Sequence, residues 1–235
     1  QLKLYGIADQ GQLINQADAH YYLGEFETAI KLTQQALDLM RELGVEPGFT
    51  LMAAKIIQAR ALTELKQFNK AAENYELSFT YFSQQVPEEH IIMVVLNSYW
   101  LDFLLKSNHS DLTKIPTPNS DLLKAQITSQ LNQSSLSKRR YINTMLIIST
   151  QLIKQNNLEQ AQIELLKVQS LLSESSAKQG WQYWLVEYIM QKLNQHLNQT
   201  VNHHTLSTSL AQLNQLLPPD HWYYSLFDKL DLDND

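Results

Sequence analysis

The segment LTELKQFNKAAENYELSFTYF, residues 62–82, decides the fold that we predict for this chain. Its apolar residues recur at intervals of three, four and seven positions, the spacing of one face of an α-helix. A second apolar helical run, 51–65, ends at the polar pair Lys66-Gln67. Two helices joined by so short a break fold back on each other, and the small side chains of Ala71 and Ala72 allow them to approach closely. The segment therefore predicts a helical hairpin.

The same pattern returns along the whole chain with a period of about 43 residues. Hairpins are predicted at residues 5–45, 49–86, 90–133, 136–177 and 180–217, followed by a short terminal helix at 221–230. Stacked hairpins of this length bury a continuous core between neighbours. We therefore expect an all-α fold, a right-handed α-solenoid in which residues 1–235 form one superhelical domain.

Three segments occupy the same place in their hairpins and share one composition. They are Gly24-Glu25-Phe26-Glu27-Thr28-Ala29, Lys66-Gln67-Phe68-Asn69-Lys70-Ala71 and Asn156-Asn157-Leu158-Glu159-Gln160-Ala161. In each, the first residue must tolerate a tight turn, a large apolar side chain plugs the hairpin, and an alanine lets the helices approach. This pattern resembles the signature of tetratricopeptide repeats (TPRs).

The joints between hairpins resemble a longer variety of these repeats. Pro87-Glu88-Glu89-His90 and Pro218-Pro219-Asp220-His221 each precede a helix start. Proline ends the outgoing helix and an acidic residue favours the N-terminus of the next. Such joints are similar to those of the roughly 42-residue TPRs of kinesin light chains and many bacterial regulatory proteins.

The third hairpin departs from the pattern at residues 107–120, SNHSDLTKIPTPNS. This stretch is too polar and too rich in proline to begin a second helix on schedule, so we expect a loop followed by a shorter helix at 121–132. An insertion without chemistry is favoured over a binding loop, because the segment carries no distinctive reactive group.

The composition excludes several classes of function. A formal net charge of -6 argues against a nucleic-acid partner, and the absence of cysteine removes disulfides, thiolate metal sites and cysteine nucleophiles. No stretch reaches the roughly 18 consecutive apolar residues of a membrane span. No phosphate-binding loop, zinc-protease motif or serine-hydrolase motif is present, and the seven histidines are scattered. We therefore predict no catalytic residue, no metal site, no cofactor and no enzymatic activity.

The chain opens at Gln1 within a helical pattern, without an initiator methionine or a signal peptide. We interpret it as a piece of a longer protein whose other part carries the output activity. Two cellular locations are compatible with the sequence: the periplasm, as part of a membrane-anchored protein, and the cytoplasm. The lack of cysteine favours the periplasm.

The resemblance implies that the first helix of each hairpin lines the concave side of the solenoid, where TPR domains bind their partners. The side chains at these positions that we predict to contact a ligand or partner are Asp18, Tyr21, Tyr22, Ile56, Arg60, Thr63, Glu64, Thr150 and Lys154. Two interpretations of an Asp18–Arg60 pair remain open. It would either contact a ligand or join two helices as a buried ion pair.

The resemblance also implies a function. We expect a non-enzymatic sensor or interaction domain of a larger bacterial signalling or transcription-regulatory protein, binding a peptide, a protein or a small-molecule ligand. The alternative is a scaffold or assembly factor that acts through protein–protein contacts and self-association, for instance as a homodimer.

Overall fold

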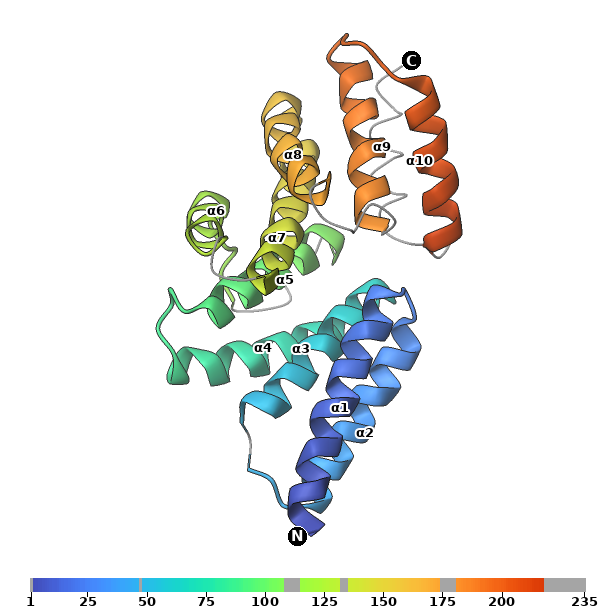
Figure 1. Cartoon of the computed structure of the whole chain (residues 1–235). Coiled ribbons are helices and arrows are strands. Elements are labelled where there is room, and N and C mark those ends of the chain that lie inside the picture. The colour runs from blue at the N-terminus through green and yellow to red at the C-terminus, as the bar shows by residue number, and fades with distance from the viewer. Residues whose placement is uncertain (1, 47, 108–114, 132–134, 174–180, 218–235) are drawn as a thin grey trace. The chain divides into compact units, whose positions relative to one another are not determined.

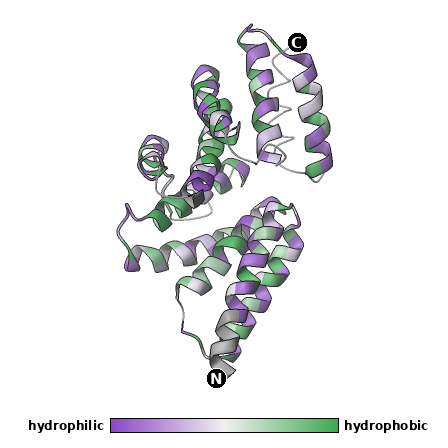
Figure 2. Cartoon of the chain, in the orientation of Figure 1, coloured by the Kyte–Doolittle hydropathy of each residue, from purple (hydrophilic) through white to green (hydrophobic). Residues whose placement is uncertain are grey.

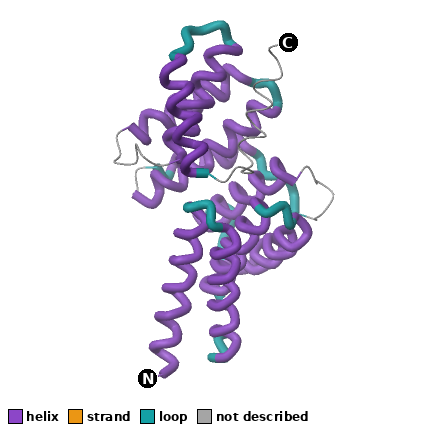
Figure 3. The backbone as a smooth tube through the Cα atoms, turned by 90° about the vertical axis from the view of Figure 1, so that its right-hand side faces the viewer, coloured by secondary structure: helices purple, strands orange, loops and turns teal. Residues whose placement is uncertain are grey.

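The computed structural model describes residues 2–46, 48–107, 115–131, 135–173 and 181–217, and these contain ten α-helices and no strand (Figures 1 and 3). The helices are α1 (Leu2–Tyr22), α2 (Phe26–Glu42), α3 (Phe49–Glu64), α4 (Phe68–Gln85), α5 (Ile91–Ser107), α6 (Ser120–Ser129), α7 (Ser135–Lys154), α8 (Leu158–Ser173), α9 (Trp181–His196) and α10 (His203–Leu216). The predicted all-α class is confirmed.

The chain divides into two compact units, Gln1–Pro118 with α1 to α5 and Asn119–Asp235 with α6 to α10. The boundary falls between α5 and α6, the two helices of the third predicted hairpin. In the first unit α5 packs on α3 and α4, and in the second unit α6 packs on α7. A single superhelical domain with five hairpins stays a prediction. The terminal helix predicted at 221–230 and residues 108–114 of the predicted loop lie outside the described residues.

Four helix pairs are joined by turns of the same geometry: α1/α2, α3/α4, α7/α8 and α9/α10. In each turn one residue adopts a left-handed backbone, with φ of 80° at Gly24, 57° at Lys66, 59° at Asn156 and 53° at Asn198. The N–H of the following residue donates to the carbonyl oxygen five positions earlier, at 2.7–2.9 Å. This is the Schellman ending of a helix, which satisfies carbonyl groups that the helix leaves unpaired. The turn residues that the repeat pattern predicted therefore carry the tight geometry.

The core of the first unit is built around three aromatic rings. Trp100 stacks on Phe103 with ring centroids 4.7 Å apart, and Tyr75 lies 5.6 Å from each of them. Ala71 and Ala72 of α4 are buried in the same cluster. In α2 the polar residues are interspersed with apolar ones (Figure 2), and its buried residues recur at the spacing of one helix face, whereas α3 is buried at every position from 57 to 63.

In the second unit α8 packs on α7 and α9, where most buried side chains are aliphatic, and a carboxylate is buried as well. Glu164 of α8 is 1% exposed and pairs with Lys124 of α6 and Lys167 of α8. Burial raises the pKa of Glu164, but the hydrogen bonds from the two lysines outweigh burial and lower that pKa below its usual value. The Lys124–Glu164 ion pair therefore links α6 to α8 within this unit.

Candidate functional site

Polar and aromatic side chains from α1, α3 and α5 meet inside the first unit. Contacts join Asp18 to Arg60 and Glu64 to Lys106 across 42 residues each, and Tyr21 to Glu64 across 43. These separations equal one repeat, and α3 packs on both α1 and α5. In stacked hairpins, one repeat step brings equivalent positions of neighbouring first helices together. We call the group formed by Asp18, Tyr21, Tyr22, Arg60, Glu64, Tyr99, Asp102 and Lys106 the charged network.

The guanidinium of Arg60 is enclosed by three tyrosine rings. Its central carbon lies 3.9 Å from the ring centroid of Tyr21, 4.2 Å from that of Tyr99 and 5.1 Å from that of Tyr22. The Arg60 side chain is 6% exposed, and its Nη1 donates to Asp18 Oδ1 at 3.0 Å. Burial disfavours the charge, but the tyrosines and Asp18 outweigh it, so the pKa of Arg60 lies above its usual value. Arg60 is a fixed cation that joins α1, α3 and α5.

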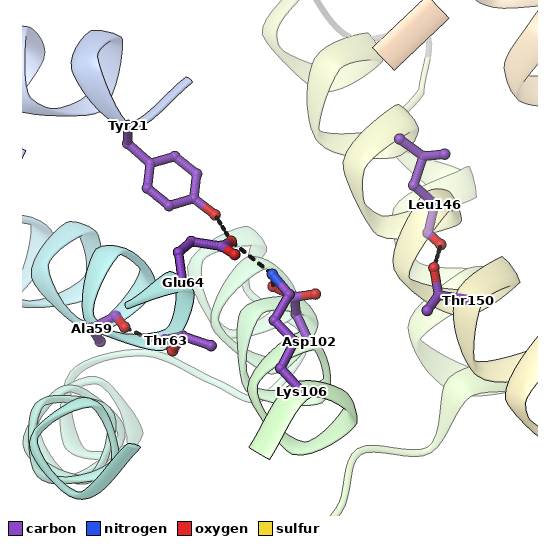
Figure 4. Close-up of polar contacts among 8 residues, drawn as sticks. All are labelled: Tyr21, Ala59, Thr63, Glu64, Asp102, Lys106, Leu146 and Thr150. Atoms are coloured by element: carbon purple, nitrogen blue, oxygen red, sulfur yellow. Dashed lines mark hydrogen bonds and ion pairs between the residues drawn. The ribbon is translucent and has the colours of Figure 1, made fainter. Parts of the chain in front are cut away.

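A carboxylate at the end of α3 forms the second half of the charged network (Figure 4). Glu64 Oε1 accepts from the Tyr21 hydroxyl at 2.8 Å and from Lys106 Nζ at 2.7 Å. Lys106 Nζ also donates to Asp102 Oδ2 at 2.6 Å. Burial raises the pKa of Tyr21 well above its usual value, and the Glu64 carboxylate adds to this effect. Tyr21 therefore remains a neutral hydrogen-bond donor at physiological pH.

The charged network holds three carboxyl groups and two cationic side chains. The side chains of Glu64 and Lys106 are 4% and 5% exposed, and Glu64 Oε2 is buried without a hydrogen-bond partner among the described residues. Burial raises the pKa of Asp102, Lys106 opposes this, and the nearby Glu64 adds to it. Burial and Glu64 thus favour the protonated form of Asp102.

The structure brings together five of the nine predicted residues: Asp18, Tyr21, Tyr22, Arg60 and Glu64. Asp18 and Arg60 form an ion pair that joins α1 to α3, and a ligand contact of either residue stays a prediction.

The other four predicted residues do not join this network. Ile56 packs against the hydrophobic core of the first unit. Thr63 and Thr150 are buried, and their hydroxyls donate to carbonyl oxygens of their own helices at 2.8 and 2.9 Å (Figure 4). Lys154 ends α7 in the second unit. A role of these four in binding stays a prediction.

Three members of the charged network were not predicted: Tyr99, Asp102 and Lys106, all from α5. The sequence did carry a signal for two of them, because Asp102 and Lys106 each lie one repeat after Arg60 and Glu64. The nine predicted residues come only from the first, second and fourth predicted hairpins. Extending the repeat frame to the third would have found both residues.

The described part of the chain contains neither a candidate metal site nor a membrane-spanning helix. No three of its histidine, aspartate and glutamate side chains are grouped closely enough to hold a metal ion. None of the helices in this part is long and apolar enough to cross a membrane.

Comparisons with known proteins address the fold. No protein-family model matches the sequence, and no curated protein does so either. Among solved structures, a match is the crystal structure of the nearly identical TPR-like repeats of a protein from Podosopora anserina named as a kinesin light chain. The TM-score is 0.51 over 87% of this chain and 92% of that chain. The fold is TPR-like.

Sequence identity over this match is 11%, so the similarity concerns the fold alone. It confirms the predicted class, a TPR-like helical repeat similar to that of kinesin light chains. The TPR-like fold also explains why the contacts of the charged network recur at one-repeat separations.

Proposed function

We propose that this TPR-like chain is a non-enzymatic interaction domain of a larger bacterial signalling or transcription-regulatory protein. In this proposal it binds a peptide or protein partner, or a small ligand, on the face formed by the first helices of its hairpins. The TPR-like fold supports this proposal, because stacked hairpins present an extended surface for a partner. The signalling context rests on the resemblance of its proline-containing joints to those of bacterial regulatory proteins.

One observation carries the proposal for the first unit: the charged network is exposed to solvent at Asp18. Asp18 is 35% exposed, whereas the Arg60 guanidinium that holds it is 6% exposed. A surface carboxylate fixed by a buried cation is already oriented for a partner, so less entropy is lost on binding. Since the exposed group of the network is the Asp18 carboxylate, we propose a partner segment that carries lysine or arginine at this point.

A peptide library displayed on phage tests the proposal. The immobilised chain is expected to enrich peptides containing lysine or arginine, whose affinities are then measured by calorimetry. Asp18→Asn keeps the shape of the side chain and should weaken binding about tenfold, the usual cost of a lost charged hydrogen bond. Asp38→Asn is a matched control, since Asp38 is an exposed carboxylate on α2 that pairs with Arg41. Enriched peptides without basic residues, or equal loss in both variants, would contradict the proposal.

The alternative, a scaffold that self-associates, has support from α8 in the second unit. Ile163 and Leu166 are 47% and 50% exposed and lie three residues apart, so they share one side of the helix. Light scattering after size-exclusion chromatography would test this alternative. A dimer that becomes monomeric when both residues are replaced by glutamate would favour the scaffold, and a monomeric native chain would argue against it.

A further inference from the structure

A cavity of about 440 Å³ lies in the first unit between α2 and α4, with α3 beneath it. We call it the α2–α4 cavity. It uses the side of α3 that bears Gln58 and Leu62, whereas the charged network uses the side that bears Arg60 and Glu64. Residues two positions apart on a helix point in nearly opposite directions, because each residue turns by about 100°. The cavity is therefore a separate feature from the site considered above.

The floor of the α2–α4 cavity is apolar, formed by Ile30, Leu62 and Leu65. Its volume falls within the range of about 300–1,000 Å³ that is usual for ligand sites. A floor of this composition suits one aliphatic side chain, whose transfer from water is favourable.

Two side-chain amides in the wall have orientations that their neighbours determine. Gln58 Oε1 accepts from Lys55 Nζ at 3.3 Å and from Asn74 Nδ2 at 3.1 Å. Because an ammonium group can only donate, the atom of Gln58 that faces Lys55 must be its oxygen. Asn74 must then present its N–H group to the same oxygen, which leaves Gln58 Nε2 and Asn74 Oδ1 without partners in the part of the chain that the structure describes. The wall thus offers one donor beside one acceptor.

The rim of the α2–α4 cavity is charged. It carries the carboxylates of Glu27 and Glu73 and the ammonium group of Lys70. Both glutamates are exposed, and neither forms an ion pair with another described residue, whereas Lys70 donates to Gln67 Oε1 at 3.2 Å. Lys55, which donates to Gln58, also interacts electrostatically with Glu73, so Glu27 is the rim carboxylate most available to a cationic group on whatever enters.

We propose that the α2–α4 cavity binds an extended peptide segment of a partner protein, in which an aliphatic residue is followed by lysine or arginine. The aliphatic side chain lies on the apolar floor. In an extended chain the N–H and C=O groups of one residue point to the same side. They pair with Asn74 Oδ1 and Gln58 Nε2, and the basic side chain lies beside Glu27 and Glu73. This second site goes beyond the binding face proposed above, and each can fail without the other.

Methyl NMR of the full chain with labelled isoleucine and leucine tests this site. The probe is the blocked tetrapeptide acetyl-Ala-Leu-Lys-Ala-amide. Two comparison peptides replace its lysine by glutamate or its leucine by glycine. We expect saturable shifts of the Ile30, Leu62 and Leu65 methyl signals, with each comparison peptide binding about tenfold more weakly.

Variants of the wall and rim complete the test. Asn74→Ala should weaken binding of the lysine peptide about fivefold, the usual effect of a lost neutral hydrogen bond. Glu27→Lys combined with Glu73→Lys should remove the preference for lysine over glutamate, and both positions are exposed, so the fold is retained. Glu88→Lys, an exposed charge reversal outside the cavity, is the control and should bind as the native chain does.

Three results would overturn the inference. The first is the absence of saturable shifts at the three floor residues, or shifts confined to methyl groups of α1 and α5. The second is equal affinity for the lysine and glutamate peptides. The third is unchanged binding by Asn74→Ala.

Discussion

Replacing Lys106 by methionine should destabilise the first unit strongly. The substitution keeps most of the aliphatic stem and removes the ammonium group, which lies 2.7 Å from Glu64 Oε1 and 2.6 Å from Asp102 Oδ2. The lysine and Glu64 side chains are at most 5% exposed, so water does not replace the lost partner. Two carboxyl groups would then lie close together with the Tyr21 hydroxyl as the remaining donor to Glu64.

The size of the effect follows from this burial. Removing one partner of a buried ion pair costs about 3–5 kcal/mol of the free energy of unfolding, because the other partner keeps its desolvation penalty. With a urea m-value of about 2 kcal/mol/M, the unfolding midpoint should fall by roughly 2 M. Asp102→Asn should lower the free energy of unfolding by less, because Lys106 keeps its ion pair with Glu64 and because burial opposes the charge of Asp102.

The pH dependence has a definite sign. A carboxyl group whose pKa is raised by folding contributes stability below its unfolded pKa and loses that contribution as pH rises through the folded pKa. In Lys106→Met the two carboxyl groups face each other without the ammonium group. The stability deficit relative to the native chain should therefore be largest at neutral pH and should shrink on acidification toward pH of about 4, near the ordinary aspartate pKa.

Urea unfolding followed by circular dichroism at several pH values measures these effects. Lys31→Met, at an exposed position of α2, is the matched control and should change stability by less than about 0.5 kcal/mol. If Lys106→Met unfolded at the same urea concentration as Lys31→Met, the charged network would not hold α3 and α5 together, and this reasoning would be refuted.

Three further substitutions test the turns, the helix packing and the second unit. Lys66→Gly should raise the free energy of unfolding by about 1 kcal/mol, because glycine adopts the left-handed backbone seen there (φ 57°) without strain. A decrease in the urea midpoint of unfolding would contradict this prediction. Ala71→Arg should lower the thermal midpoint, at a cost of several kcal/mol, because Ala71 is completely buried and has no room for a charged side chain; an unchanged midpoint would exclude the assigned repeat register. Glu164 has a lowered pKa, so its contribution to stability is present above the unfolded pKa of about 4.3 and is lost as pH falls through the folded value. The Glu164→Gln variant should accordingly lose less stability than the native chain between pH 7 and pH 3, as measured by urea unfolding. If the free energy of unfolding of both proteins changed with pH in parallel, the role given to the lysine partners of Glu164 would be contradicted.

The sequence was sufficient to predict the elements that depend on local pattern. Gly24, Lys66 and Asn156 were recognised as equivalent turn residues from their place in the repeat, and all three have positive φ. A lysine in a left-handed turn has no signature of its own and was found only through the register. Periodicity predicts such positions well because it averages over several copies of one hairpin.

The parts that were not predicted depend on contacts between side chains from different helices. The enclosure of Arg60 by Tyr21 and Tyr99 follows from side-chain rotamers, which the repeat spacing does not specify. The α2–α4 cavity follows from how side chains of three helices leave space among them. A helical repeat pattern predicts which helix face a residue belongs to. It does not predict whether that face packs against another helix, forms ion pairs or lines a cavity.

The alternation of charge in the charged network restricts how the first unit could evolve. Successive first helices carry Asp18, Arg60 and Asp102 at equivalent positions, and Glu64 is followed by Lys106. Many repeat arrays lengthen by duplicating one hairpin, because all their interfaces are alike. Duplicating the second hairpin here would set one guanidinium beside another, and deleting it would set two aspartates together. A change in the number or order of hairpins in this unit would therefore require matching changes at these charged positions. The ion pairs thus constrain the length of the first unit.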